Sequence, residues 1–178
     1  MGDSMSSIVV SGDTSGAITL AAPAVSGTNT LTMPALTGTL VTNKTAGTIV
    51  QVVQATYATV TSTTSTSYVS SPLAVTITPT SSTNKILIMG SVPFDCFNAS
   101  PPQASLTLYR NSTNLASVGF ALLSAPTNAQ SCQAINYLDS PATTSATTYT
   151  IYFKASAGTA RLCIDNYLGT LIAMEVVA

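Results

Sequence analysis

The chain has very few charged side chains and no histidine. Only five Lys or Arg and six Asp or Glu occur among 178 residues, 6% of the chain, where a typical soluble domain has roughly 25%. Five scattered cations cannot neutralise a run of phosphates, so binding of nucleic acid through a basic surface is excluded. Without histidine, a Ser-His-Asp or Cys-His catalytic arrangement within one chain is excluded as well.

Cysteine is also scarce and lacks the spacing of a metal site. Cys96, Cys132 and Cys163 lie far apart, with no CxxC pair. A zinc site takes four N or S ligands, so we expect neither a metal nor a cofactor. A small buried thiol is the first expectation for each cysteine. A single disulfide is the alternative, and the spacing does not select its pair.

Long apolar runs are absent. The longest, residues 86–89 and 171–174, are far shorter than a membrane span, so we expect no membrane partner. The first fifteen residues contain no Lys or Arg and no continuous apolar region, which is unlike a secretory signal. We therefore expect synthesis in a cytoplasm.

Hydroxyl side chains and a period of two dominate the sequence. Ser and Thr make up 53 of 178 residues, and β-branched residues alternate with polar ones in most segments. The pattern predicts an antiparallel, all-β sandwich with little helix. The expected strands are residues 47–60, 73–78, 85–92, 104–110, 115–122, 133–138, 147–154, 159–165 and 170–177, with a hairpin turn at 111–114.

The first 45 residues differ from the rest. Residues 11–41 are short strand-like pieces interrupted by Gly, Pro23 and Pro34, too thin in apolar content to form a core. We expect a head of residues 46–178 preceded by an arm of residues 1–45. The arm is either a flexible leader or an extended segment that becomes ordered against a partner or intertwines with identical chains. Its candidate contact residues are Ile18, Leu20, Leu31, Leu36 and Leu40.

Several segments resemble structural proteins of tailed bacteriophages. The resemblance rests on residues 15–40, 77–88, 106–110 and 137–149, and together these segments and their surroundings cover most of the chain. It implies a jelly-roll head that forms a homotrimer, carried on an N-terminal attachment segment. It also implies a place in the virion, with the major capsid protein or another virion protein as partner.

Two virion roles follow from the resemblance. Capsid cement or decoration is favoured, because long tail fibres usually carry far more sequence. A tail-fibre or receptor-binding protein that recognises a host surface glycan is the alternative. Its candidate loops are residues 94–103, 124–130 and 167–170.

Four residues are candidates for a subunit interface. Arg110 follows an alternating strand, where it either caps a turn or reaches a neighbouring chain. Glu175 lies in an apolar terminal strand, so its carboxylate must face solvent, pair with a cation or line a symmetry axis; exposure is the first expectation. Tyr149 and Tyr152 point to opposite faces of one strand because their separation is odd, so one of them is available to a subunit or a sugar.

The carboxylates give a weak case for catalysis. Asp139 lies in a Leu-Asp-Ser-Pro turn, where it is expected to bond backbone amides. Asp165 is expected to pair with Arg161 or Arg110. A glycan hydrolase that uses Asp95 and Asp165 is the remaining enzymatic alternative. We expect no enzyme.

Overall fold

The computed structural model describes residues 7–11, 17–21, 46–115, 120–123 and 128–178. The chain forms two compact units, Met1–Leu40 and Val41–Ala178. In the first unit, β1 (Ser7–Ser11) pairs antiparallel with β2 (Ala17–Ala21). The predicted boundary at residue 45 stays a prediction.

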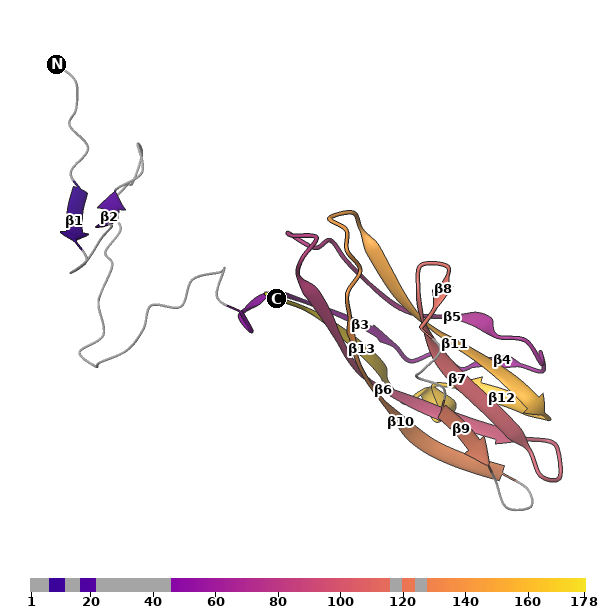
Figure 1. The fold of residues 1–178 in the computed structure, drawn as a ribbon. Coiled ribbons are helices and arrows are strands. Elements are labelled where there is room, and N and C mark those ends of the chain that lie inside the picture. The colour runs from indigo at the N-terminus through magenta and orange to yellow at the C-terminus, as the bar shows by residue number, and fades with distance from the viewer. Residues whose placement is uncertain (1–6, 12–16, 22–45, 116–119, 124–127) are drawn as a thin grey trace. The chain divides into compact units, whose positions relative to one another are not determined.

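The second unit is built from two antiparallel sheets (Figure 1). The six-stranded sheet contains β3 (Ile49–Tyr57), β4 (Thr61–Thr63), β6 (Lys85–Phe97), β10 (Asn128–Asp139), β12 (Thr159–Leu162) and β13 (Gly169–Val176). The five-stranded sheet contains β5 (Val69–Ile77), β7 (Gln103–Arg110), β8 (Thr113–Asn114), β9 (Phe120–Leu123) and β11 (Thr147–Ala157). The chain crosses repeatedly between the sheets, as in a jelly roll. The predicted all-β antiparallel sandwich is confirmed.

The thirteen-residue strand β6 is the centre of the six-stranded sheet. β10 pairs with its whole length on one side. On the other side β13 pairs with residues 85–91 and β12 with residues 94–97. β3 and β4 then pair with β13 and β12, respectively. The broad part of this sheet is therefore the four strands β10, β6, β13 and β3.

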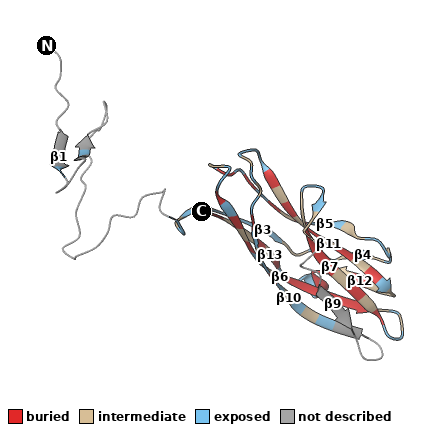
Figure 2. Cartoon of the chain, viewed as in Figure 1, coloured by how far each residue is buried: buried red, intermediate tan, exposed pale blue. Residues whose placement is uncertain are grey.

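The core lies between the sheets because inward-facing residues alternate with outward-facing ones. Along β11 and β13 every second side chain is buried (Figure 2). Alternation with period two is the geometry of a strand with one face on a core. The largest fully buried side chains are Tyr149, Phe94, Phe153, Leu73, Ile77, Ile86, Ile88, Leu106, Leu108, Ile135, Ile151 and Leu162.

Three predicted strands are shorter or divided in the structure. The expected strand 47–60 ends at Tyr57, and β4 follows it as a separate piece. Of the expected strand 115–122, residues 116–119 lie outside the described residues; β8 falls in the predicted turn at 111–114, β9 covers the end of the expected strand, and both pair antiparallel with β7. The expected strand 159–165 ends at Leu162, where the 3-10 helix η1 (Ile164–Asn166) begins after Cys163 in the left-handed region at φ 54°. Period-two patterning continued through these positions and gave no sign of the breaks.

No residue in the described ranges belongs to a helix with the length and hydropathy of a membrane span.

Candidate functional site

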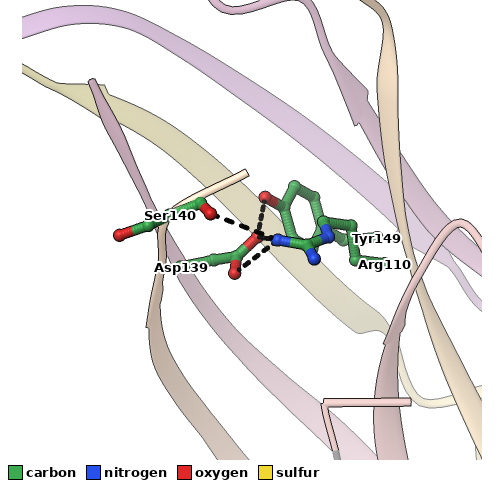
Figure 3. A network of polar contacts seen from close by, with 4 residues as sticks. All are labelled: Arg110, Asp139, Ser140 and Tyr149. Carbon is green, nitrogen blue, oxygen red and sulfur yellow. Dashed lines mark hydrogen bonds and ion pairs between the residues drawn. The ribbon is translucent and has the colours of Figure 1, made fainter. Parts of the chain in front are cut away.

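Asp139, Arg110 and Tyr149 form a polar network that joins the two sheets (Figure 3). Arg110 Nη1 donates to Asp139 Oδ1 at 2.9 Å and Oδ2 at 3.0 Å, and the Tyr149 hydroxyl donates to Oδ2 at 2.7 Å. Asp139 ends β10 in one sheet, whereas Arg110 and Tyr149 lie on β7 and β11 in the other. Burial, reinforced by the bond to Asp139, raises the pKa of Tyr149. Asp139 thus binds side chains across the sandwich, in place of the turn-capping role expected for it.

A second ion pair joins Asp95 to Arg161, which face each other on β6 and β12. Arg161 Nε donates to Asp95 Oδ1 at 3.0 Å, Nη2 donates to Oδ2, and the guanidinium lies 4.2 Å from the centroid of the Phe97 ring. The hydrogen bond to Asp95 raises the pKa of Arg161. Asp165, which was expected to pair with Arg161 or Arg110, is instead exposed in η1. Asp95 is buried beside its arginine, whereas Asp165, the other carboxylate of the hydrolase alternative, is exposed in η1.

Glu175 is fully buried at the end of β13, on the core side of the sheet. Its Oε1 accepts hydrogen bonds from the Thr80 amide at 2.7 Å, the Thr80 hydroxyl at 2.8 Å and Asn84 Nδ2 at 2.7 Å. Its Oε2 accepts one from Gln51 Nε2 at 2.6 Å. Burial alone would raise the pKa of this carboxyl, but the bonds from Gln51, Asn84 and Thr80 outweigh burial and lower it. Glu175 therefore ties β13 and β3 to the loop before β6 through neutral donors, where exposure was expected.

These networks account for the three buried carboxylates of the described residues, Asp95, Asp139 and Glu175. Across the described ranges, no group of three His, Cys, Asp or Glu side chains could hold a metal ion. Cys96 and Cys163 are buried as expected, and burial raises the pKa of Cys163. Cys132 is exposed, and none of the three forms the disulfide considered as an alternative. The remaining candidate sites of the second unit are the outer faces of its two sheets.

The outer face of the six-stranded sheet carries a row of large apolar side chains. Strand register places Leu138 beside Leu87, Leu87 beside Met174 and Met174 beside Val52, across β10, β6, β13 and β3. Residues opposite each other in antiparallel strands point to the same face. Leu138 and Val52 are 52% and 57% exposed. The neighbouring row adds two more apolar residues, and we call the six together the apolar face: Val52, Leu87, Met89, Leu138, Ile172 and Met174.

The outer face of the five-stranded sheet has a different chemistry. Tyr109 and Tyr152 stack there with ring centroids 3.8 Å apart. Lys154 Nζ lies 5.0 Å from the centroid of the Tyr68 ring, and the hydroxyls of Thr76 and Thr148 are 2.8 Å apart. This surface is amphipathic and rich in hydroxyls, so the large aliphatic side chains are concentrated on the other sheet.

A pocket of about 480 Å³ lies further along β6 and β10, on the same sheet as the apolar face. Residues from β6, β10 and the connection between β12 and β13 line it: Pro93, Gln130, Ser131, Cys132, Ile164, Tyr167 and Leu168. Tyr167 and Leu168 are 61% and 56% exposed. The pocket wall is therefore largely apolar and open to a partner.

Of the four candidate interface residues, Arg110 and Tyr149 meet at Asp139, whereas Tyr152 and Glu175 lie outside that network. Tyr149 and Glu175 are fully buried within one chain, so the expectation of a subunit contact does not hold for them. Arg110 and Tyr152 are half-buried and stay interface predictions. Of the candidate arm contacts, Ile18 and Leu20 lie in β2. Leu31, Leu36 and Leu40 lie outside the described residues.

The apolar face was missed in the sequence because residues 85–92 were predicted as a strand without separating its two faces. A signal was present. Met89 alternates with the buried Ile88, and the cross-strand neighbour of Leu87 is the last apolar residue of β10, Leu138. The alternation of aliphatic residues on both faces of β6 indicated a second, outer contact as well as a core.

No family model and no curated protein matches the chain. Among solved structures, it is similar to infectious bursal disease virus Gx strain at 16% identity and a TM-score of 0.39, over 96% of this chain and 46% of that chain. The VP2 subviral particle of infectious bursal disease virus gives 15% identity and a TM-score of 0.37, over 72% and 37%. Derived T=1 particles of that virus give 14% and 0.39, over 95% and 44%. The chain spans less than half the length of each of these.

Proposed function

We propose that the protein is a non-enzymatic structural protein of a tailed-bacteriophage virion, a homotrimeric capsid cement or decoration protein. In this proposal the N-terminal arm docks on the shell, and the head reinforces the shell or projects from it. The resemblance of residues 15–40, 77–88, 106–110 and 137–149 to phage structural proteins supports the virion role. The observation that carries the proposal is the apolar face.

The apolar face has the properties of an association surface. It contains no charged residue, and the nearest ion pair on that sheet, Asp95 with Arg161, is internally neutralised. Lys85, two residues before Leu87 on β6, is an exposed cation at the border of the face, so subunits that meet through the six apolar residues alone bring no like charges into contact. Exposed apolar patches of this kind mark protein interfaces in soluble proteins. A closed trimer removes such a face from water without open-ended growth.

The sheet edges support the same conclusion. β10 and β3 are the two long edges of the six-stranded sheet, and neither contains Pro, Lys or Arg. By contrast, β5 at an edge of the five-stranded sheet contains Pro72. Unprotected edges are a hazard for a monomer and an opportunity for an assembly. Assembly through the six-stranded sheet would protect its edges and its face together.

A tail-fibre or receptor-binding protein is the second candidate. The stacked pair Tyr109 and Tyr152, beside hydroxyl side chains, is the observation that favours a host glycan as ligand. Copy number in purified virions separates the two roles, because a decoration protein covers the shell whereas fibres are few. A high copy number with no binding to host glycan supports decoration.

The experiment is to measure mass in solution by light scattering. We expect three times the 18.1 kDa of one chain. The double substitution Met89→Lys and Leu138→Lys places two charges on exposed positions of the apolar face and is expected to give monomers. The matched control, Thr76→Lys, places a charge on an exposed position of the other sheet and is expected to remain trimeric. A wild-type protein with the mass of one chain would overturn the trimer proposal. A double variant that stays trimeric would show that the subunits do not meet through the apolar face.

A further inference from the structure

The arm contains a tandem repeat of a short proline-containing motif. Residues 20–28 and 31–39 both follow the pattern Leu-x-x-Pro-Ala-(Val or Leu)-(Ser or Thr)-Gly-Thr, eleven residues apart. Each unit presents Pro-Ala followed by an aliphatic residue, and neither contains a charge. Two copies of one short apolar motif are what a segment needs in order to bind two equivalent sites.

We infer that the pocket beside η1 binds a Pro-Ala-(Val or Leu) unit from the arm of a second copy of this chain. The inference rests on the proposed trimer. Pro93, Ile164, Tyr167 and Leu168 give the pocket an apolar wall that includes one aromatic ring. Short proline-containing segments bind aromatic-lined grooves because proline limits the entropy lost on binding. The pocket volume of about 480 Å³ is in the range of sites that enclose a small ligand.

Charge supports an apolar occupant from the same chain. No charged residue lines the pocket. Asp95, which is two residues beyond Pro93 on β6 and opposite the pocket residue Gln130, is engaged by Arg161. An uncharged arm unit therefore enters without desolvating an unpaired charge.

The interface area favours a second copy over the chain's own arm. Two rows of side chains, each taking about 6.8 Å along the strands, across four strands about 4.8 Å apart, give the apolar face about 260 Å² in plan. A stable interface buries about 800 Å² on each partner. An arm that crosses to a neighbouring head supplies the missing area, and the pocket lies on the sheet that carries the face.

The arm is long enough for this contact. Twelve residues separate Pro34 from Ala46, and an extended chain of that length reaches about 40 Å. β3 starts at the end of the sheet where Lys85 lies. Pro93 is eight residues further along β6, about 27 Å from Lys85. That reach exceeds the distance along one head from the start of β3 to the pocket, and the arm of a neighbouring copy has the same length.

Cys132 is a built-in probe, because it lines the pocket and is exposed whereas Cys96 and Cys163 are buried. The measurement is the rate at which a thiol reagent modifies Cys132 in the full-length protein. The variant Val25→Asp with Leu36→Asp disables both arm units. If the units fill the pocket nine-tenths of the time, this variant reacts about tenfold faster than wild type. The control, Thr30→Asp with Thr42→Asp, adds the same charge between and after the units and is expected to react at the wild-type rate.

A mixing experiment identifies the source of the unit. The Val25→Asp, Leu36→Asp chain keeps Cys132 as reporter, and a full-length Cys132→Ser chain supplies intact arms. After subunit exchange, protection of the reporter thiol supports binding between copies. Protection of wild type without protection in the mixture would assign the pocket to the chain's own arm and overturn the inference. Equal rates for all arm variants would overturn it as well.

Light scattering on the same samples separates this inference from the proposed function. A trimer whose Cys132 rate is insensitive to the arm units contradicts the arm contact alone. A monomeric wild type contradicts the trimer itself.

Discussion

Replacing Glu175 by Gln tests whether the buried carboxylate stabilises the end of the sandwich. The Gln oxygen can keep the three hydrogen bonds made by Thr80 and Asn84. Its amide nitrogen then faces Gln51 Nε2, which is a donor. Gln51 cannot rotate its amide freely, because the same nitrogen donates to the Thr78 carbonyl at 2.7 Å. Two donors, one on the fully buried side chain at 175 and one on the half-buried Gln51, are therefore left facing each other.

An unsatisfied buried donor costs about 1–3 kcal/mol. We expect Glu175→Gln to lower the free energy of unfolding by about 2–3 kcal/mol at neutral pH. Each kcal/mol shifts the melting temperature of a domain of this size by about 4 °C, so the variant should melt about 8–12 °C lower. Urea unfolding at a fixed protein concentration is the assay, because self-association makes apparent stability depend on concentration.

The pH dependence gives an independent test. The pKa of Glu175 is lower in the folded protein than its usual 4.5. Its ionisation therefore adds stability above the unfolded-state pKa, and this contribution is lost as pH falls through the lower folded-state pKa. We expect the difference between wild type and Glu175→Gln to shrink between about pH 5 and about pH 3.

The control is Asp165→Asn, which removes an exposed carboxylate at φ 51°, a conformation that Asn tolerates well. This variant should change stability by less than about 0.5 kcal/mol. Two results would refute the reasoning: a Glu175→Gln protein as stable as wild type at neutral pH, or a stability difference that does not change with pH.

Two further predictions concern the packing of the head. Tyr149→Phe removes the hydroxyl that donates to Asp139 and should lower the free energy of unfolding in urea by about 1.5–3 kcal/mol. A loss below about 0.5 kcal/mol would show that the network adds little stability. Gly47 and Gly158 share φ 82°, but a Cβ at Gly47 meets open space, whereas one at Gly158 lies 2.1 Å from the Phe97 carbonyl oxygen. Gly47→Ala should therefore cost about 1–2 kcal/mol, and Gly158→Ala clearly more, measured by thermal melting; equal costs would contradict the close approach.

The sequence predicted the sandwich because alternation is a local property. A strand such as β11 shows its buried and outward positions in the order of its residues, from Thr147 to Ala155. The breaks after Tyr57 and Leu162 could not be predicted in the same way. They occur where β6 exchanges one neighbour for another, β13 for β12, which is a property of the sheet and not of a segment.

The polar networks depend on long-range pairing, and the sequence could not assign them. Glu175 meets Asn84 and Thr80, which are 91 and 95 residues away, because the loop before β6 closes over the end of β13. Arg110 meets Asp139 because β7 and β10 lie in opposite sheets. In a chain with so few charges, each arginine had several carboxylates to choose from, and spacing along the chain did not discriminate among them.

The placement of the charges links the fold to the proposed assembly. Two ion pairs and Glu175 use five of the eight charged residues in 46–178 for contacts within the head. Charges that form ion pairs or hydrogen bonds inside the head do not repel neighbouring molecules from its surface. The outer face of the five-stranded sheet then presents mainly hydroxyls, and that of the six-stranded sheet presents aliphatic side chains. Burial of the aliphatic face by another subunit therefore stabilises an assembly more than burial of the hydroxyl face, and it desolvates fewer polar groups. The double variant Met89→Lys, Leu138→Lys is therefore expected to be a monomer in which both internal ion pairs remain intact.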